Sequence, residues 1–193
     1  MPVPAATLAA LRPPFPSSPS PGPTRLRVPD LLYATDQAAD DVLSGRCDHL
    51  LPPGGIPASR RWFTRIHGDE ELDVWLISWV PGHPTELHDH GGSLGVLTVV
   101  SGSLNEYRWD GRALRRRRLD AGDQAGFPLG WVHDVVWAPR PVSCRAVAAA
   151  QAAPTLSVHA YSPPLTAMSY YDITERKTLR RQRTELTDQP EGS

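Results

Sequence analysis

The stretches Gly82-His-Pro-Thr-Glu-Leu-His88-Asp-His90 and Pro128-Leu-Gly-Trp-Val-His133 contain the residues that decide the fold of this chain. His88 and His90 are separated by one residue, and successive side chains on a strand point to opposite faces. We therefore expect both imidazoles on one face of a strand, with His133 completing the set from a neighbouring strand. The two stretches together predict a metal site with three histidine ligands in a β-barrel.

Length and composition favour one globular domain. The chain has 193 residues, of which 40% are hydrophobic, enough for a single core. Its formal net charge of −1 provides no field that would attract nucleic acid or an anionic membrane. The one dense basic run, Arg115 to Arg118, is expected to be a solvated hairpin tip. We predict neither a nucleic-acid partner nor a membrane partner.

The cysteines and the beginning of the chain predict a cytoplasmic protein. Cys47 and Cys144 lie far apart and form no CxxC pair, so we expect reduced thiols. The first residues lack the basic and apolar regions of a signal peptide, and no apolar run is long enough to span a membrane. A closed barrel needs no partner, so we expect a monomer.

The sequence divides into three parts. Residues 1–24 are rich in proline, which predicts a disordered leader. Residues 25–175 form the expected single domain, which begins with a helical region from Val28 to about Leu51 with Asp30 as its N-cap. Residues 176–193 are highly charged and are expected to be a frayed or solvent-facing tail.

The centre of the chain has the pattern of short strands. β-Branched and aromatic runs alternate with Gly, Pro, Asp and Asn, which favours an all-β barrel or sandwich with a short N-terminal helical region. The predicted strands cover residues 72–79, 96–100, 104–109, 132–137 and 156–161.

The glycines and histidines occur at spacings that resemble the paired motifs of the cupin superfamily. The first motif reads G-x5-H-x-H from Gly82, and the second reads G-x5-P-x-G-x2-H from Gly122. The resemblance implies a small jelly-roll β-barrel that holds a metal ion in its mouth. In the usual cupin a glutamate follows the first two histidines as a further ligand, but here that position is Gly95. We therefore expect three neutral imidazoles and no carboxylate.

Three segments are similar to the cysteine dioxygenase family, over roughly residues 60–172. They are Thr85-Glu-Leu-His88-Asp-His90-Gly-Gly-Ser, the segment at His133, and Ser157-Val-His-Ala-Tyr-Ser-Pro-Pro. The resemblance implies a non-haem Fe(II) enzyme with His88, His90 and His133 as metal ligands. Such an enzyme adds both atoms of O2 to a thiol sulfur, so its partners would be a small thiol and O2.

Ser157, His159 and Tyr161 are spaced by two residues, which places them on one face of a strand. In the resembled family these positions form a hydrogen-bonded relay beside the iron, with the tyrosine hydroxyl near substrate and oxygen. An exposed polar strand face is the alternative. Animal members crosslink this tyrosine to a cysteine near the position of Gly95, and glycine excludes that crosslink.

The resemblance also suggests a substrate. An arginine at the position of Arg65 grips the substrate carboxylate in the family, and relatives for 3-mercaptopropionate carry glutamine instead. Arg65 therefore favours L-cysteine, with cysteine sulfinic acid as the product. A surface role for Arg65, another small thiol as substrate, and a non-catalytic cupin that binds a metal or small ligand are the alternatives.

Three further predictions concern the neighbours of the ligands, the remaining histidines and an insert. Asp89 and Asp134 adjoin metal ligands, so one of them could orient an imidazole, and a surface role is the alternative. The histidines at positions 49, 67 and 83 are not expected to be ligands. The alanine-rich insert at 139–154 is expected to extend a hairpin.

Overall fold

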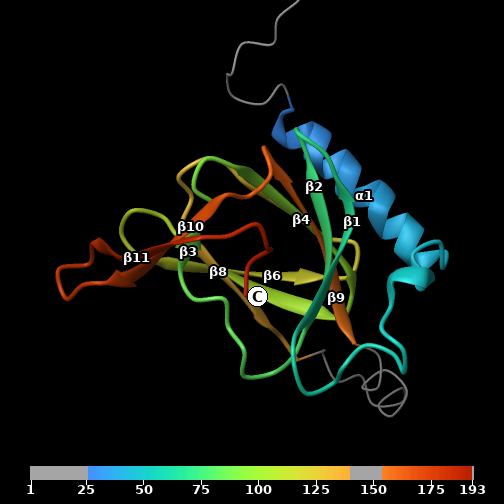
Figure 1. The fold of residues 1–193 in the computed structure, drawn as a ribbon. Helices are drawn as coiled ribbons and strands as arrows, with labels where there is room; N and C mark the ends of the chain where they lie inside the picture. The colour runs from blue at the N-terminus through green and yellow to red at the C-terminus, as the bar shows by residue number, and fades with distance from the viewer. Residues whose placement is uncertain (1–25, 140–153, 193) are drawn as a thin grey trace, which may run out of the picture.

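A computed structural model describes residues 26–139 and 154–192 of the chain. The predicted leader and most of the predicted insert lie outside these residues. The described residues form two antiparallel sheets and one α-helix (Figure 1), which confirms the predicted cupin-type jelly-roll with an N-terminal helical region.

The five-stranded sheet contains, in order, β1 (Trp62–Gly68), β2 (Asp73–Trp79), β9 (Thr155–Ser162), β4 (Leu94–Ser101) and β7 (Gln124–Phe127). The six-stranded sheet contains β11 (Leu179–Leu186), β10 (Ala167–Ile173), β3 (His88–Asp89), β8 (His133–Trp137), β5 (Ser103–Trp109) and β6 (Leu114–Asp120). A 3-10 turn, η1 (Asp48–Leu50), follows the helix.

The helix α1 (Val28–Leu43) is shorter than expected and begins differently. Asp30 is not the N-cap: Arg27 holds that position, and its backbone N–H donates to Asp30 Oδ2 at 2.7 Å. Asp30 therefore caps the helix from its third residue, where a carboxylate also favours the positive end of the helix dipole. No helix among the described residues has the length and apolarity needed to cross a membrane.

The five-stranded sheet is buried on both faces because its strands alternate between two cores. Val158 and Ala160 of β9 pack with Leu31 of α1 on the outer face. Tyr161 of the same strand belongs to the core between the two sheets. The middle strand β9 therefore presents apolar side chains to the helix and its other face to the barrel interior.

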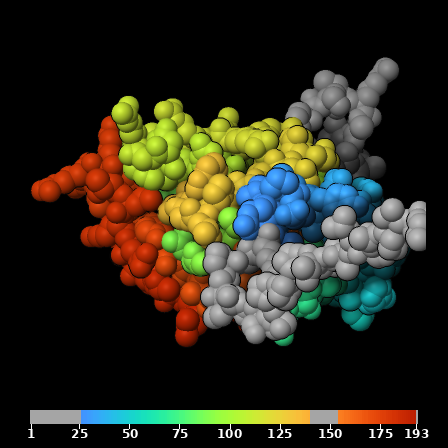
Figure 2. All heavy atoms as spheres, turned by 90° about the horizontal axis from the view of Figure 1, so that it is seen from above, coloured from blue at the N-terminus to red at the C-terminus, as the bar shows by residue number. Residues whose placement is uncertain are grey.

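Two charged segments are largely exposed, as predicted, but both form strands, which was not predicted. Arg115 to Arg118 lie inside strand β6, and the hairpin turn closes earlier, where the Asp110 N–H donates to the Ala113 carbonyl. The charged tail is ordered as β11, which pairs along its length with β10. The strands β10 and β11 lie on the opposite side of the molecule from α1 (Figures 1 and 2).

The burial of Leu31 gives a test of the helix–sheet contact. Leu31 is 0% exposed, whereas Leu43 at the end of the same helix is 68% exposed. We expect Leu31→Ala to lower the free energy of unfolding by about 2–4 kcal/mol, because it leaves a cavity against the sheet. Leu43→Ala, the control, should change it by less than about 0.5 kcal/mol in denaturant titrations. Equal effects of the two substitutions would contradict the described packing.

Candidate metal centre

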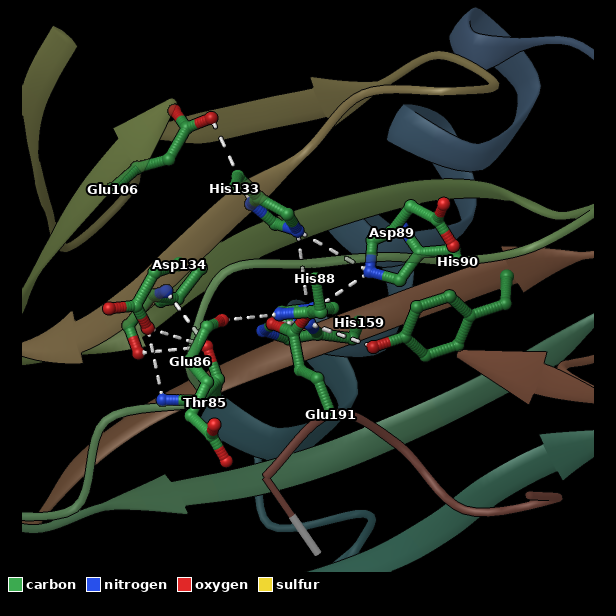
Figure 3. Close-up of polar contacts among 12 residues, drawn as sticks. Thr85, Glu86, His88, Asp89, His90, Glu106, His133, Asp134, His159 and Glu191 are labelled. Carbon is green, nitrogen blue, oxygen red and sulfur yellow. Dashed lines mark hydrogen bonds and ion pairs between the residues drawn. The ribbon is translucent and has the colours of Figure 1, made fainter. Parts of the chain in front are cut away.

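The three predicted histidine ligands meet inside the barrel. His88 and His133 are opposite each other across β3 and β8, and His90 follows β3 directly. The Nε2 atoms of His90 and His133 are 3.4 Å apart. All three side chains are buried, and Figure 3 shows them converging from the two motifs that the sequence analysis identified.

The ring of His88 is fixed by a backbone contact. Its Nδ1 lies 2.8 Å from the carbonyl oxygen of Glu86, and a carbonyl can only accept, so Nδ1 carries the proton. Burial opposes protonation of this ring, but pairing with Glu191 outweighs it and raises the pKa of His88, so a metal ion at Nε2 would replace the proton there. Glu86 adopts a φ of 63°, a strained value for this residue type, and its carboxylate is held by Arg183 at 2.9 Å.

A carboxylate completes the group, contrary to the expectation of three imidazoles alone. Glu191, from the segment after β11, is fully buried, with Oε2 2.8 Å from His88 Nε2 and 3.1 Å from His90 Nε2. The same oxygen lies 3.6 Å from His133 Nε2. One donor atom from each of these four residues lies within 4.8 Å of the others, an arrangement that could hold a metal ion (Figure 3).

The charges within this group depend on one another. Burial opposes ionisation of Glu191, but the surrounding imidazoles outweigh it and hold its pKa well below the usual value. Burial lowers the pKa of His90, and burial with the charge of His88 lowers that of His133 well below the usual value. Both rings therefore favour the neutral form, which has the free lone pair that a metal ligand needs.

Gly95 leaves the space that the ring of His90 occupies. A Cβ atom at position 95 would lie 2.7 Å from His90 Nδ1 and 3.2 Å from the ring of Phe127. Neither neighbour can move easily, because both side chains are buried. The glutamate of the usual cupin motif therefore has no room at this position, and Glu191 supplies the carboxylate from another part of the chain.

The residues Ser157, His159 and Tyr161 form the expected hydrogen-bonded line in the interior. Tyr161 Oη lies 3.3 Å from His159 Nδ1, and His159 Nε2 lies 2.9 Å from Ser157 Oγ. Trp79 Nε1 donates to Ser157 Oγ at 2.8 Å, a contact that the sequence analysis missed. All three predicted residues are fully buried, so they are not an exposed strand face.

This line adjoins the metal group. His159 Nδ1 lies 3.0 Å from Oε1 of Glu191, the oxygen that does not face His88. Burial raises the pKa of Tyr161 well above its usual value, so its phenol remains protonated at neutral pH. A protonated hydroxyl therefore lies beside the histidine cluster, where it can donate a hydrogen bond.

Arg65, the predicted carboxylate contact, is not among the histidines. Its guanidinium lies over the ring of Trp75 at 4.6 Å, and its Nε is 3.3 Å from Asp73 Oδ1. Its side chain is 43% exposed and lines a cavity of about 390 Å³ with Asp188 and Gln189, which precede Glu191. The assignment of Arg65 to the substrate stays a prediction.

Arg61 contacts the main chain of Glu191, the residue that completes the metal group. Its Nη2 donates to the carbonyl oxygen of Glu191 at 2.9 Å, and its guanidinium lies 3.9 Å above the ring of Trp79. Its buried Nε and Nη1 have no hydrogen-bond partner among the described residues. Burial lowers the pKa of this guanidinium, as expected for a cation with few partners.

The two aspartates next to the ligands do not contact an imidazole. Asp89 accepts hydrogen bonds from the Tyr171 hydroxyl and the Gly91 N–H, and Asp134 accepts from Thr85. The carboxylate nearest a ligand's outer nitrogen is instead Glu106, whose Oε1 lies 3.9 Å from His133 Nδ1. The histidines at positions 49, 67 and 83 are absent from the metal group found in the described part of the chain.

Sequence patterns contain no signal for Glu191, which stands in a short charged segment without periodicity. Arg60 and Arg61 are close to Arg65 in the sequence and are alternatives to it, but nothing in the spacing selects Arg61. The position of Glu191 follows from where the chain returns after β11, which no local spacing encodes.

The close contact at Gly95 predicts the effect of adding a methyl group. We expect Gly95→Ala to displace the ring of His90 and weaken Fe(II) or Zn(II) binding by about 10–100-fold, the usual range when support of a ligand is lost. Gly92→Ala is the control, because nothing lies within 4 Å of a Cβ atom there. Competition with a metal chelator measures both affinities. Unchanged affinity in Gly95→Ala would show that His90 does not depend on this space.

Known proteins similar to this chain include one family and several solved structures. The family described as "Cysteine dioxygenase type I" matches residues 57–174. Among solved structures, KdgF from Halomonas sp. is similar at 17% identity with a TM-score of 0.43, covering 53% of this chain and 80% of that one. A cupin superfamily protein from Desulfitobacterium hafniense is similar at 9% identity with a TM-score of 0.41, covering 55% of this chain and 80% of that one.

The family match includes the residues that build the interior site. It spans more than half of the 193 residues and contains the histidine cluster and the line that ends at Tyr161. Glu191 lies outside the matched range. This chain belongs to the cysteine dioxygenase type I family.

Proposed function

We propose that this protein is an Fe(II)-dependent dioxygenase that adds both atoms of O2 to the sulfur of L-cysteine. The observation that carries the proposal is the convergence of His88, His90 and His133 beside the buried Tyr161 hydroxyl, within the range that the family matches. The product is cysteine sulfinic acid. The electrons that reduce O2 come from the sulfur, so no further reductant is needed.

The donor set fits a divalent metal ion. Three imidazoles and a carboxylate suit Fe(II) as well as zinc, so iron itself is part of the proposal. The Glu86 carbonyl fixes the ring of His88, and Gly95 leaves space for His90. A bound Fe(II) ion would supply the Lewis-acid and redox chemistry, favouring the thiolate form of the substrate and activating O2.

The protein's own groups orient the substrate and control its protons. The Tyr161 hydroxyl donates a hydrogen bond to the substrate, and its raised pKa keeps the proton on it. His159 and Ser157 hold that hydroxyl in place, and Trp79 fixes Ser157 from the other side. Because every member of this line is buried, the reacting atoms are shielded from water.

An arginine is needed for the carboxylate of cysteine. We propose Arg61 for this contact, because its guanidinium lies beside Glu191 and has two buried nitrogens without a partner among the described residues. A planar guanidinium can donate two parallel hydrogen bonds to one carboxylate. Arg65, which the sequence favours, lines the neighbouring cavity and is the alternative.

Two other functions have some support. The first is a dioxygenase for a different small thiol, such as 3-mercaptopropionate. It is supported by the contacts of Arg65 with Trp75 and Asp73, since the preference for cysteine was derived from an Arg65 that is free to bind the substrate carboxylate. A non-catalytic cupin that binds a metal is favoured by Glu191, which occupies the fourth position of the donor group.

The remaining expectations become proposals about context. We propose that the partners are one small thiol and O2, and that the protein acts in the cytoplasm as a monomer. The buried free thiol of Cys47 is compatible with a reducing compartment. Sedimentation of the purified protein measures the oligomeric state directly.

Product analysis tests the reaction and the substrate together. We expect iron-loaded protein to convert L-cysteine to its sulfinic acid with both oxygens from isotopically labelled O2. Cysteamine and 3-mercaptopropionate should react with lower kcat/KM, because each lacks one of the groups that cysteine offers. Mass spectrometry of the products identifies the label. If no thiol gains two oxygen atoms, the protein is not a thiol dioxygenase.

Two matched substitutions distinguish the arginines. We expect Arg61→Gln to lower kcat/KM for cysteine by about 10–100-fold, which corresponds to the loss of one charge-assisted hydrogen bond. Turnover of cysteamine, which has no carboxylate, should change little in the same variant. Arg65→Gln is the comparison. A larger loss in Arg65→Gln, again confined to thiols with a carboxylate, would assign the contact to Arg65.

A further inference from the structure

The segment after β11 returns to the interior of the barrel, where Glu191 lies among the histidines. Thr187 N–H donates to the Thr166 carbonyl at 3.1 Å, and Gln189 N–H donates to Thr187 Oγ1 at 3.0 Å, which turns the chain inward. Glu191 then reaches the histidines with no exposed surface (Figure 3). We call residues 188–192 the Glu191 strap.

Two arginines hold the main chain of the strap. Arg65 Nη2 donates to the Asp188 carbonyl at 3.2 Å, and Arg61 Nη2 donates to the Glu191 carbonyl at 2.9 Å. Gly192 lies against Arg61 with a φ of 71°, and a Cβ atom there would overlap the Arg61 guanidinium. Glycine therefore permits both this backbone conformation and this close approach.

Under the proposed function, the strap and the substrate would use the same groups. The carboxylate oxygen of Glu191 lies among the three histidines, and the Glu191 backbone carbonyl takes a hydrogen bond from Arg61. The thiolate of a substrate would replace the first contact, and its carboxylate would replace the second. Because the group is fully buried, substrate and Glu191 cannot both occupy it.

The contacts that hold the strap are polar. They are hydrogen bonds from two arginines to its main chain and ion pairs of the Glu191 carboxylate with the histidines, and β11, which precedes the strap, is largely exposed. A carbonyl oxygen also satisfies Arg61 poorly, because two of its buried nitrogens remain without a partner among the described residues. A substrate carboxylate would accept from two of these donors at once and would favour release of the strap.

We propose that Glu191 is an exchangeable fourth ligand and that substrate binds by displacing the Glu191 strap. This inference rests on the proposed function only in the choice of ligand. The strap determines specificity, because a molecule must replace both the carboxylate at the histidines and the carbonyl at Arg61. A ligand with only one of these groups leaves one of the two contacts unreplaced, so it displaces the strap weakly.

Hydrogen exchange measures the displacement without turnover. In Fe(II)-loaded protein under anaerobic conditions, we expect the amides of residues 187–192 to exchange faster when saturating L-cysteine is added. Cysteamine, which lacks the carboxylate, should produce a smaller increase at the same concentration. The β10 amides serve as the internal control. Unchanged exchange in the strap, with cysteine binding verified by calorimetry, would overturn the proposal.

A substitution measures the competition directly. We expect Glu191→Gln to bind cysteine about tenfold more tightly in anaerobic calorimetry, because a strap that fills about 90% of the sites reduces apparent affinity tenfold. The same variant should bind the metal more weakly, since an ionised ligand is lost. Glu185→Gln, an exposed glutamate of β11, is the charge-matched control and should leave both constants unchanged. Unchanged or weaker cysteine binding by Glu191→Gln would mean that the strap does not compete.

A second variant distinguishes the effect of the whole strap from the effect of the Glu191 carboxylate alone. Deletion of residues 188–193 should also tighten cysteine binding, and the unfolding transition of each variant verifies that it is folded. None of these measurements requires product formation. A protein that oxidises no thiol but releases the strap supports this inference against the proposed function. A dioxygenase whose cysteine affinity is the same with and without Glu191 supports the proposed function against this inference.

Discussion

The alternation of side chains along β9 is the constraint on which both the fold and the site depend. This strand lies in the middle of its sheet, paired with β2 and β4, and both of its faces are buried, one against the helix and the other in the core between the sheets. Val158 and Ala160 pack towards the helix, whereas His159 and Tyr161 face the interior. A shift of one residue would place the imidazole against the helix and valine at the site. The register that buries the apolar side chains therefore also positions the chemical groups.

The sequence predicts the parts of the site that local geometry controls. The spacing of His88, in the two-residue strand β3, and His90, directly after it, brings both rings to one group, and pairing with β8 brings in His133. The limits of this reasoning are seen at Asp30 and at Arg115 to Arg118. Asp30 caps the helix from its third residue, a local difference of three positions. The arginines form an exposed strand because β5 provides the backbone partners, which is tertiary pairing that overrides local preference.

Glu191 shows why a ligand set cannot be completed from motif spacing alone. The motif position for a carboxylate is Gly95, where the ring of His90 fills the space of a side chain. The carboxylate that does reach the histidines comes from beyond the last strand, and its position depends on where β11 leaves the sheet. A ligand on β4 would be fixed by backbone pairing on both sides. The Glu191 strap has no strand pairing, and it is held by hydrogen bonds to its main chain and by the ion pairs of its carboxylate, contacts that another carboxylate ligand could replace.

Arg61 has buried N–H groups that the strap does not satisfy and that a substrate carboxylate could satisfy. A buried guanidinium loses hydration, and each buried N–H without an acceptor costs about 1–3 kcal/mol. The strap provides a carbonyl to one nitrogen and leaves Nε and Nη1 without a described partner. A carboxylate accepts two hydrogen bonds and carries a compensating charge. With the strap in place, the unsatisfied N–H groups of Arg61 keep their desolvation cost, and a carboxylate ligand would remove that cost. A ligand with a carboxylate therefore displaces the strap more readily than a ligand without one.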